Sequence, residues 1–255
     1  MARVRAINVS AVKSLHLTRV AHATVGRDGI EHDREFMLAD ATGRIATQRN
    51  TRMLAQISSA YDADAGELEL VLPGGERVRA TPRPIGTTTV ELWGREFPAT
   101  VMNGPFADAV SEVVGAPLRL LRAQDGIRGL DSHAISVLSQ ASVEEVASRG
   151  GRERLDARRF RPTLLIDGCE AHAEDAWVGG IVRAGTARLR VVRLDPRCAL
   201  TTLDPDTGER DADTLRWLAG YRRHEDGQVY CGIYADVEEP GHVRVGDEVE
   251  PLEDA

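Results

Sequence analysis

The stretch ELELVLPGG, residues 67–75, has the pattern of one β-strand that ends in a tight turn. Leucine alternates with glutamate at period two, and Pro73, Gly74 and Gly75 follow the strand. Similar segments recur through the first hundred residues. Strands are predicted at residues 3–9, 17–25, 35–40, 56–62, 67–73 and 88–93. Many short strands separated by glycine and proline turns are typical of a β-barrel or a β-sandwich.

The second half of the chain mixes helices with strands. Helices are predicted at 104–115, 139–150 and 211–220, and strands at 162–167, 187–194, 229–235 and 242–250. Pro105 has the place of a first-turn proline and Gly115 that of a terminating glycine. Ser142 and Glu145 have the spacing of a capping box. We therefore expect a mainly β fold with some helices (α+β) and a domain boundary near residues 100–110.

Composition limits the classes of function. The chain has 255 residues, 42% of them apolar, and a net charge of −8, which argues against broad nucleic-acid binding. No apolar run is long enough to cross a membrane, and the N-terminus has no signal-peptide core. The three cysteines form neither a C-x-x-C pair nor an iron–sulfur motif, so no disulfide framework is expected. We expect a cytoplasmic protein that binds neither nucleic acid nor membrane.

Three polar segments have both a structural and a functional interpretation. The arginine-rich segment 149–162 is either a solvated helix end or a local anion site. The segment CEAHAED, 169–175, holds metal-binding residue types without the regular spacing of a zinc site. The segment DPDTGERDAD, 204–213, begins like a calcium loop but offers no glutamate at the twelfth position, so a tight turn is predicted. The sequence contains no hydrolase, Walker A or dinucleotide-binding motif.

Cys198 is the most informative single residue. An isolated cysteine is usually a small buried hydrophobic residue. Here, however, Arg197 precedes it and would favour the thiolate, which is the form that binds soft metals. Thr201 and Thr202 follow and offer hydroxyl groups that could support such a ligand. Both interpretations, packing residue and metal ligand, are open on these residues alone.

Nine segments in order along the chain carry a resemblance to a known family. They are VKS (12–14), GRDGIEHDREFML (26–38), ATQR (46–49), LSQAS (138–142), RRFRPTLLI (158–166), EDAW (174–177), RCALTTLDPDTG (197–208), CGIY (231–234) and GHVRVGDEV (241–249). The chain resembles MOSC-domain proteins that carry an N-terminal MOSC β-barrel domain. Within that family it is most similar to the mitochondrial amidoxime-reducing component and its bacterial counterparts. The resemblance implies an N-terminal barrel-like domain over residues 1–105 and a β-barrel MOSC domain over 106–255.

The resemblance also implies a molybdenum cofactor, in which a pterin dithiolene holds the metal and one protein cysteine adds a further ligand. Cys198 matches that cysteine and is therefore the implied metal ligand and catalytic residue. The implied cofactor-binding residues are Lys13, Ser14, Arg34, Ser132, His133, Arg161, Thr163, Pro196, Arg197, Cys198 and Tyr234. Three positions depart from the family pattern: Thr163 stands where relatives often have asparagine, Pro196 where they have a small polar residue, and Ala134 where they have proline.

We expect a molybdenum-dependent oxidoreductase that reduces N-hydroxylated small molecules by transferring oxygen from the substrate to molybdenum. Because the sequence has no cluster cysteines, electrons are expected from a separate ferredoxin- or cytochrome b5-like donor with its reductase. No requirement for pyridoxal phosphate is expected. Two alternatives belong to other classes of function. One is a sulfurtransferase that carries persulfide sulfur on Cys198, and the other is a non-catalytic carrier of molybdopterin.

Overall fold

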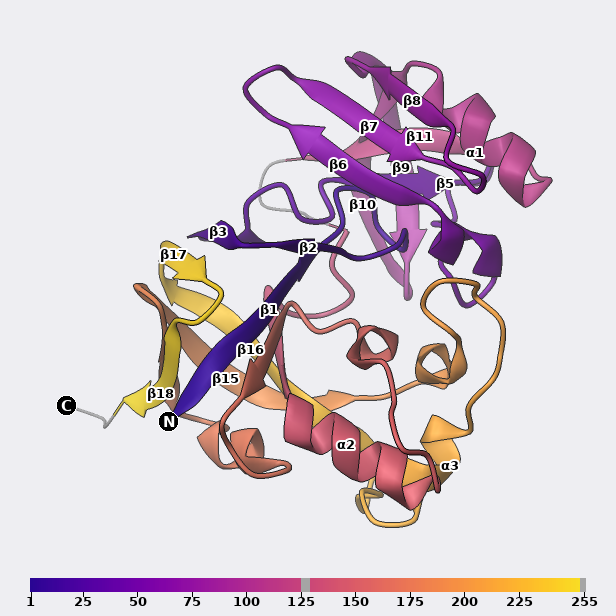
Figure 1. Ribbon diagram of the computed structural model, residues 1–255. Helices are drawn as coiled ribbons and strands as arrows, with labels where there is room; N and C mark the ends of the chain where they lie inside the picture. Colours follow the sequence, from indigo (N-terminus) through magenta and orange to yellow (C-terminus); the bar gives the residue numbers. More distant parts are fainter. Residues whose placement is uncertain (125–128, 253–255) are drawn as a thin grey trace.

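A closed β-barrel forms the larger lobe of the protein (Figure 1). The structure is a computed structural model and describes residues 1–124 and 129–252. Around the barrel the strands follow the order β13 (Leu164–Asp167), β12 (Ile135–Ser139), β16 (Tyr230–Glu239), β15 (Ala187–Pro196), β14 (Ile181–Ala184), β18 (Glu248–Leu252) and β1 (Ala2–Val9). β1 pairs antiparallel with both β18 and β13 and so closes the ring, and β2 (Thr18–Val20) adds to its edge. Only the pairing of β12 with β13 in this sheet is parallel.

Alternation along these strands builds the barrel core. In β1, Val4 and Ile7 are buried, and they pack with Val182, Leu189 and Ile233 of other barrel strands in one hydrophobic cluster. Burying such side chains contributes about 1.5–3 kcal/mol each. The first strand of the chain is therefore part of the core of the second half.

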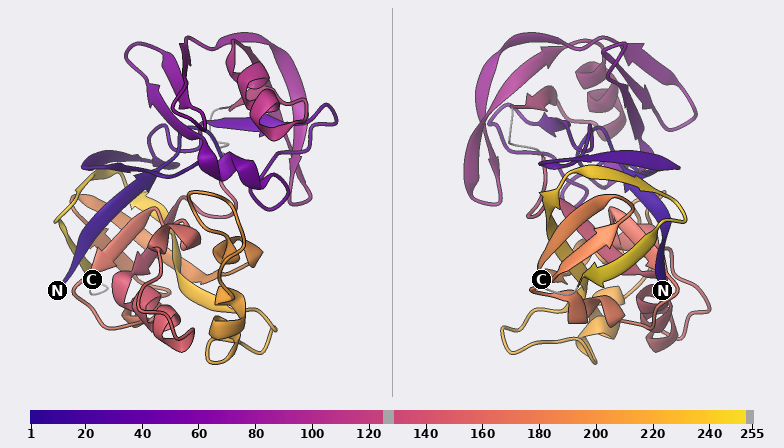
Figure 2. Two further views of the ribbon diagram at one scale, coloured as in Figure 1. Left: turned by 45° about the vertical axis from the view of Figure 1, so that its right-hand side comes forward. Right: turned by 90° about the vertical axis from the view of Figure 1, so that its left-hand side faces the viewer.

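The smaller lobe carries two sheets and one helix. One sheet has the order β5 (Phe36–Ala39), β11 (Arg119–Ala123), β10 (Arg95–Asn103) and β9 (Arg83–Leu92), and the other has the order β6 (Ser58–Asp62), β7 (Glu67–Val71) and β8 (Arg77–Ala80). Helix α1 (Phe106–Val114) packs through Phe106 and Val110 on the core of this lobe. In both views of Figure 2 the smaller lobe, in purple, lies above the barrel.

Shorter elements connect and cover the lobes. β17 (Gly241–Arg244), β3 (His22–Gly26) and β4 (Gly29–Ile30) form a small sheet. The helices α2 (Gln140–Arg149) and α3 (Thr214–Ala219) pack together over a satellite core of the barrel lobe. The 3-10 helices are η1 (Arg52–Gln56), η2 (Ala157–Phe160), η3 (Ala173–Trp177) and η4 (Ala199–Thr202). Within the described residues, no helix has the length and apolar character needed to cross a bilayer.

The mainly β fold with some helices is confirmed, and several local predictions need correction. The capping box was wrong: helix α2 begins at Gln140, and the Ser139 side chain caps it by accepting a hydrogen bond from the Ser142 amide at 3.1 Å. Pro105 lies at the cap position of α1, one residue before the first turn, while Gly115 ends that helix with φ of +71° as expected. The predicted strands 17–25 and 242–250 are each two strands separated by a break. The domain boundary at 105/106 stays a prediction.

Candidate functional site

One cleft gathers every residue that the sequence nominated. The cleft has a volume of about 850 Å³, which includes open solvent at its mouth. Its walls include Lys13, Ser14, Arg34, Ser132, His133, Arg161, Thr163, Pro196, Arg197, Cys198 and Tyr234, together with further residues that were not predicted. These residues come from the loop after β1, the segments before β5 and β12, and the connection from η2 to β13. The others come from the end of β15 with the residues that follow it, and from the middle of β16. Whether each of them binds a cofactor stays a prediction.

Lys13 lies at the floor of the cleft with 3% of its surface exposed. Its Nζ donates to Asp131 Oδ1 and to the Gly129 carbonyl, both at 2.6 Å. Burial lowers the pKa of Lys13, and the Asp131 carboxylate opposes this effect. Burial would raise the pKa of Asp131, but the Lys13 charge and hydrogen bond hold it well below its usual range. Lys13 and Asp131 thus form an ion pair that connects the loop after β1 with the segment before β12.

Arg161 is a partly buried cation that forms no ion pair among the described residues. Its guanidinium donates to the Leu15 carbonyl at 2.9 Å, and it forms no ion pair with any carboxylate in the described part of the chain. Burial and then the nearby charge of Arg34 lower the pKa of Arg161 to about 9. Arg34, in contrast, pairs with Asp33. The carboxylates whose charges oppose this shift, Asp131 and Asp33, are already paired with Lys13 and Arg34. A desolvated guanidinium without an ion pair of its own favours binding of an anion at this point.

Arg197 lines the cleft and braces the loop that carries Cys198. Its Nε donates to the Cys231 carbonyl at 2.7 Å and its Nη1 to the Phe160 carbonyl at 2.8 Å. It also forms an ion pair with Asp195 at 2.7 Å. Gly232 is required beside it, because a Cβ there would lie 2.7 Å from the Val137 carbonyl oxygen. Arg197 therefore connects the loop that carries Cys198 with β16 and with η2.

Asp195 is the functional candidate that sequence reasoning missed. It ends β15 at 1% exposure and lines the cleft. Burial raises the pKa of Asp195 to about 7, although the Arg197 charge opposes this. Its Oδ1 is buried without a hydrogen-bond partner in the described structure. The sequence does show an acidic residue three positions before Cys198. The alternating pattern, however, indicates only that this residue lies near the end of a strand.

Cys198 begins the 3-10 turn η4 and is partly buried. The two threonines act on the turn rather than on the sulfur. Thr201 Oγ1 donates to the Cys198 carbonyl at 3.1 Å, and Thr202 Oγ1 donates to the Ala199 carbonyl at 2.6 Å. Thr201 Oγ1 also lies 2.7 Å from Thr214 Oγ1 of α3. The hydroxyls therefore fix the backbone that presents the thiol, and their support of a metal ligand stays a prediction.

Thr163, His133 and Tyr234 complete the wall of the cleft. The Thr163 amide donates to Ser136 Oγ at 2.9 Å, and the hydroxyls of these two residues lie 3.3 Å apart. His133 Nδ1 lies 3.1 Å from Asp236 Oδ1, and its ring centroid is 5.4 Å from that of Tyr234. Burial raises the pKa of Tyr234. These contacts place the side chains of the wall in one connected network.

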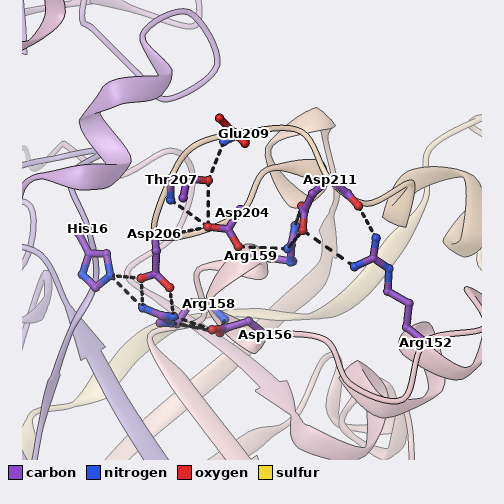
Figure 3. Close-up of polar contacts among 10 residues, drawn as sticks. All are labelled: His16, Arg152, Asp156, Arg158, Arg159, Asp204, Asp206, Thr207, Glu209 and Asp211. Carbon is purple, nitrogen blue, oxygen red and sulfur yellow. Dashed lines mark hydrogen bonds and ion pairs between the residues drawn. The ribbon is translucent and has the colours of Figure 1, made fainter.

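The arginine-rich segment is largely neutralised by a neighbouring loop (Figure 3). Arg158 binds Asp156 and also donates to both carboxylate oxygens of Asp206, at 2.7 and 2.9 Å. Arg159 donates to both oxygens of Asp211, at 2.6 and 2.7 Å. Of the arginines at 158, 159 and 161, Arg161 alone has no acidic partner among the described residues. Of these three arginines, Arg161 is therefore the one that best fits the predicted anion site.

The loop 204–211 is the predicted tight turn. Asp204 Oδ1 accepts from the amides of Asp206 and Thr207, at 3.0 and 2.8 Å, so this oxygen serves the turn itself (Figure 3). Gln56 of the smaller lobe donates to the Thr207 carbonyl at 3.0 Å. In residues 1–124 and 129–252, no cluster of three or more histidine, cysteine or acidic side chains could hold a metal.

Comparison with known proteins agrees with this arrangement. Residues 124–250 match the MOSC domain, and residues 1–117 match the MOSC N-terminal beta barrel domain. Mitochondrial amidoxime-reducing component 1 of Xenopus laevis is 37% identical over 93% of this chain and 78% of its own length. Its human namesake is 28% identical over 94% of this chain and 79% of its own length. The molybdenum cofactor sulfurase of Solanum lycopersicum is 25% identical over 96% of this chain and 35% of its own length. The chain therefore belongs to the MOSC family and carries that family's N-terminal barrel domain ahead of its MOSC domain.

Proposed function

We propose that this protein is a molybdenum-cofactor-dependent oxidoreductase that reduces N-hydroxylated small molecules. The names of its amidoxime-reducing relatives suggest the reaction. One observation carries the proposal: a cleft in which a single cysteine and a partly buried, unpaired arginine face the same space. This combination suits a ligand that has a soft metal at one end and a phosphate at the other.

The cleft residues fit the cofactor chemically. Arg161 would gain the missing countercharge from the pterin phosphate, with Arg34 nearby. Cys198 would add its thiolate to the metal, and the cradle of η4 and α3 fixes the position of that thiolate. When bound, the cofactor supplies the two-electron redox chemistry. The protein supplies binding, orientation and a shielded space around the substrate.

Protons must also reach the substrate. Reduction of an N–OH group to N–H and water takes up two electrons and two protons. Asp195 is a buried acid of the cleft with a pKa of about 7, so its carboxyl oxygen can hold a proton near neutral pH. Electrons come, in this proposal, from a separate ferredoxin- or cytochrome b5-like donor in the cytoplasm.

Sulfur transfer is the second candidate, favoured by the name of the tomato relative. In that function Cys198 would carry a persulfide to an acceptor and would not need tightly bound molybdenum. Metal content separates the two functions. A non-catalytic carrier would instead contain the cofactor but show no turnover.

The test is metal content and reduction measured together on protein from a host that makes the cofactor. We expect about one molybdenum per chain and reduction of an amidoxime with dithionite-reduced dye, but no reduction with NADH alone. Arg161→Ala should purify with much less molybdenum, because one charged hydrogen bond contributes roughly 1.5–3 kcal/mol. Arg154→Ala, at an exposed position of the same segment, is the matched control and should keep full occupancy. Protein without metal and without pterin would contradict the proposal.

A further inference from the structure

Trp93 occupies a position that neither turn geometry nor core packing explains. It forms, with Gly94, the two-residue turn between β9 and β10, with φ of +56° and +76° respectively. Such turns favour asparagine and glycine, and a bulky residue at positive φ costs about 1–3 kcal/mol. The side chain is 46% exposed and belongs to no hydrophobic cluster of the described residues. Strain at an exposed aromatic residue therefore points to a function.

The indole is nevertheless held in place. Its Nε1 donates to Asp131 Oδ1 at 2.9 Å, and this same oxygen accepts from Lys13. Arg95 secures the turn by donating to the carbonyls of Leu130 and Asp131, at 3.2 and 3.3 Å. The Arg49 guanidinium carbon lies 4.1 Å from the centroid of the indole and covers one of its faces. One edge and one face of the ring are thus used for positioning.

The indole is also part of the wall of the cleft. Trp93 and Arg49 line the same space as Cys198. No aromatic ring in the described part of the chain stacks on Trp93. A rigid indole with one free face is a stacking platform for another planar π-system. The hydrogen bond to Asp131, which Lys13 holds in turn, and the Arg95 contacts of the turn fix the indole beforehand. A ligand would therefore not have to order this side chain on binding.

We propose that the free face of Trp93 stacks against the ring of a planar, aromatic N-hydroxylated substrate, and that this contact makes the protein prefer aromatic over aliphatic members of that class. The inference rests on the proposed reductase function and adds the substrate class to it. In this inference, Trp93 and Arg49 of the smaller lobe recognise the substrate, and residues of the barrel lobe carry out the chemistry.

The kinetic test compares two amidoximes that share the reacting group: benzamidoxime, with a phenyl ring, and acetamidoxime, with a methyl group. With dithionite-reduced methyl viologen as donor, Trp93→Ala should lower the ratio of the two kcat/KM values, aromatic over aliphatic, about tenfold. Trp93→Phe keeps a ring but loses the N–H bond to Asp131, and it should stay within about threefold of the native ratio. Ile85→Ala, at a 65% exposed position of β9 outside the cleft, should not change either substrate's kinetics.

Binding is measured separately from turnover. Without an electron donor, benzamidoxime should quench the tryptophan fluorescence of the native protein saturably, and this quench should be absent in Trp93→Phe.

Molybdenum and pterin are assayed in every variant. Loss of cofactor in Trp93→Ala would show that the ring packs on the pterin instead, and equal behaviour of the alanine and phenylalanine variants would show that Trp93 only holds Asp131. Either result overturns the inference, as does an unquenched native protein. If native protein with full molybdenum reduces neither amidoxime, the reductase function fails, and the fluorescence titration still decides on the platform.

Discussion

Cys198 differs from the two other cysteines in its surroundings. Cys231 is fully buried in the satellite core, and burial raises its pKa to about 12. Cys169 packs beside the barrel core, where burial also raises its pKa. Cys198 lines the cleft. A thiol buried in apolar surroundings is inert, whereas a thiol in an accessible and electropositive site can bind metal.

We therefore expect Cys198→Ser to abolish amidoxime reduction and to leave the urea unfolding curve in place. Serine has a similar size but a hard oxygen that ligates the metal poorly where a thiolate is needed. Cys169→Ser and Cys231→Ser are the controls and should keep activity, with some loss of stability for the buried Cys231. Activity and metal content are measured on all three variants. Full activity in Cys198→Ser would mean that another residue holds the metal.

Asp195 should make stability depend on pH. Because its folded pKa of about 7 lies above the usual aspartate value of 3.8, the folded protein holds a proton there that the unfolded chain releases. Its stabilising contribution is complete below pH 3.8 and is lost as the pH rises to 7. From pH 5 to pH 7 this loss is about 2 kcal/mol at 1.36 kcal/mol per unit, because the carboxyl is already half ionised at pH 7. Asp195→Asn should remove this dependence in cofactor-free protein, as read from urea unfolding at pH 5 and 8. Parallel curves for the two proteins would contradict the assignment.

Residues that carry a recognisable motif could be predicted, whereas those that depend on burial could not. Cys198 and Arg161 stand in segments whose letters alone carry the resemblance, and both line the cleft. Asp195 and Trp93 line it as well, but no letter pattern shows that an acid is buried or that a turn is strained. Such properties arise only when distant segments fold together.

At the level of elements, the loop 204–211 depends on one glycine. Gly208 has φ of +75°, and a Cβ at this residue would lie 2.4 Å from the Arg52 carbonyl oxygen of η1. Gly227 has nearly the same φ, +78°, but a Cβ there would meet nothing within 4 Å. Comparing substitutions at Gly208 and Gly227 therefore separates two free-energy costs. One is the cost of the left-handed backbone conformation, and the other is the cost of crowding between the loop and the smaller lobe.

Gly227→Ala should therefore destabilise the protein by about 1–2 kcal/mol, through backbone conformation alone. Gly208→Ala should cost a further 1–3 kcal/mol, since Arg52 or the loop must shift. The free energy of unfolding in urea measures both effects. Equal losses in the two variants would show that the loop accommodates the methyl group without strain.

Strand existence was easier to predict than strand limits. The hairpin that begins at ELELVLP is present as β7 and β8, because alternation and a glycine turn both act locally. The segment 17–25 instead divides into β2 and β3, which join different sheets. Likewise, Ser139 rather than Ser142 caps α2, because the end of β12 fixes where the helix begins. The ends of these elements depend on which distant strands pair with them, and this pairing cannot be read from a local sequence pattern.

At the scale of the whole molecule, β1 makes the two halves interdependent. It belongs to the first segment of the chain, yet it fills the gap between β18 and β13. Ala2 pairs with Val249, so the start of β1 lies beside β18 (Figure 1). Without β1, two strand edges and the hydrophobic face around Ile7 would be open to water.

A barrel fragment should therefore fold only when β1 is supplied. Residues 129–252 alone lack β1 and also lack β3, which pairs with β17. The same fragment joined after residue 252 by a short glycine–serine linker to residues 1–30 contains β1 to β4 and can close the ring. We expect a cooperative urea transition, followed by circular dichroism, for the joined fragment and none for residues 129–252 alone. A third version that carries Ile7→Asp in the joined segment should lose the transition, because a buried carboxylate would replace a core side chain. Cooperative unfolding of residues 129–252 alone would show that the barrel closes without its first strand.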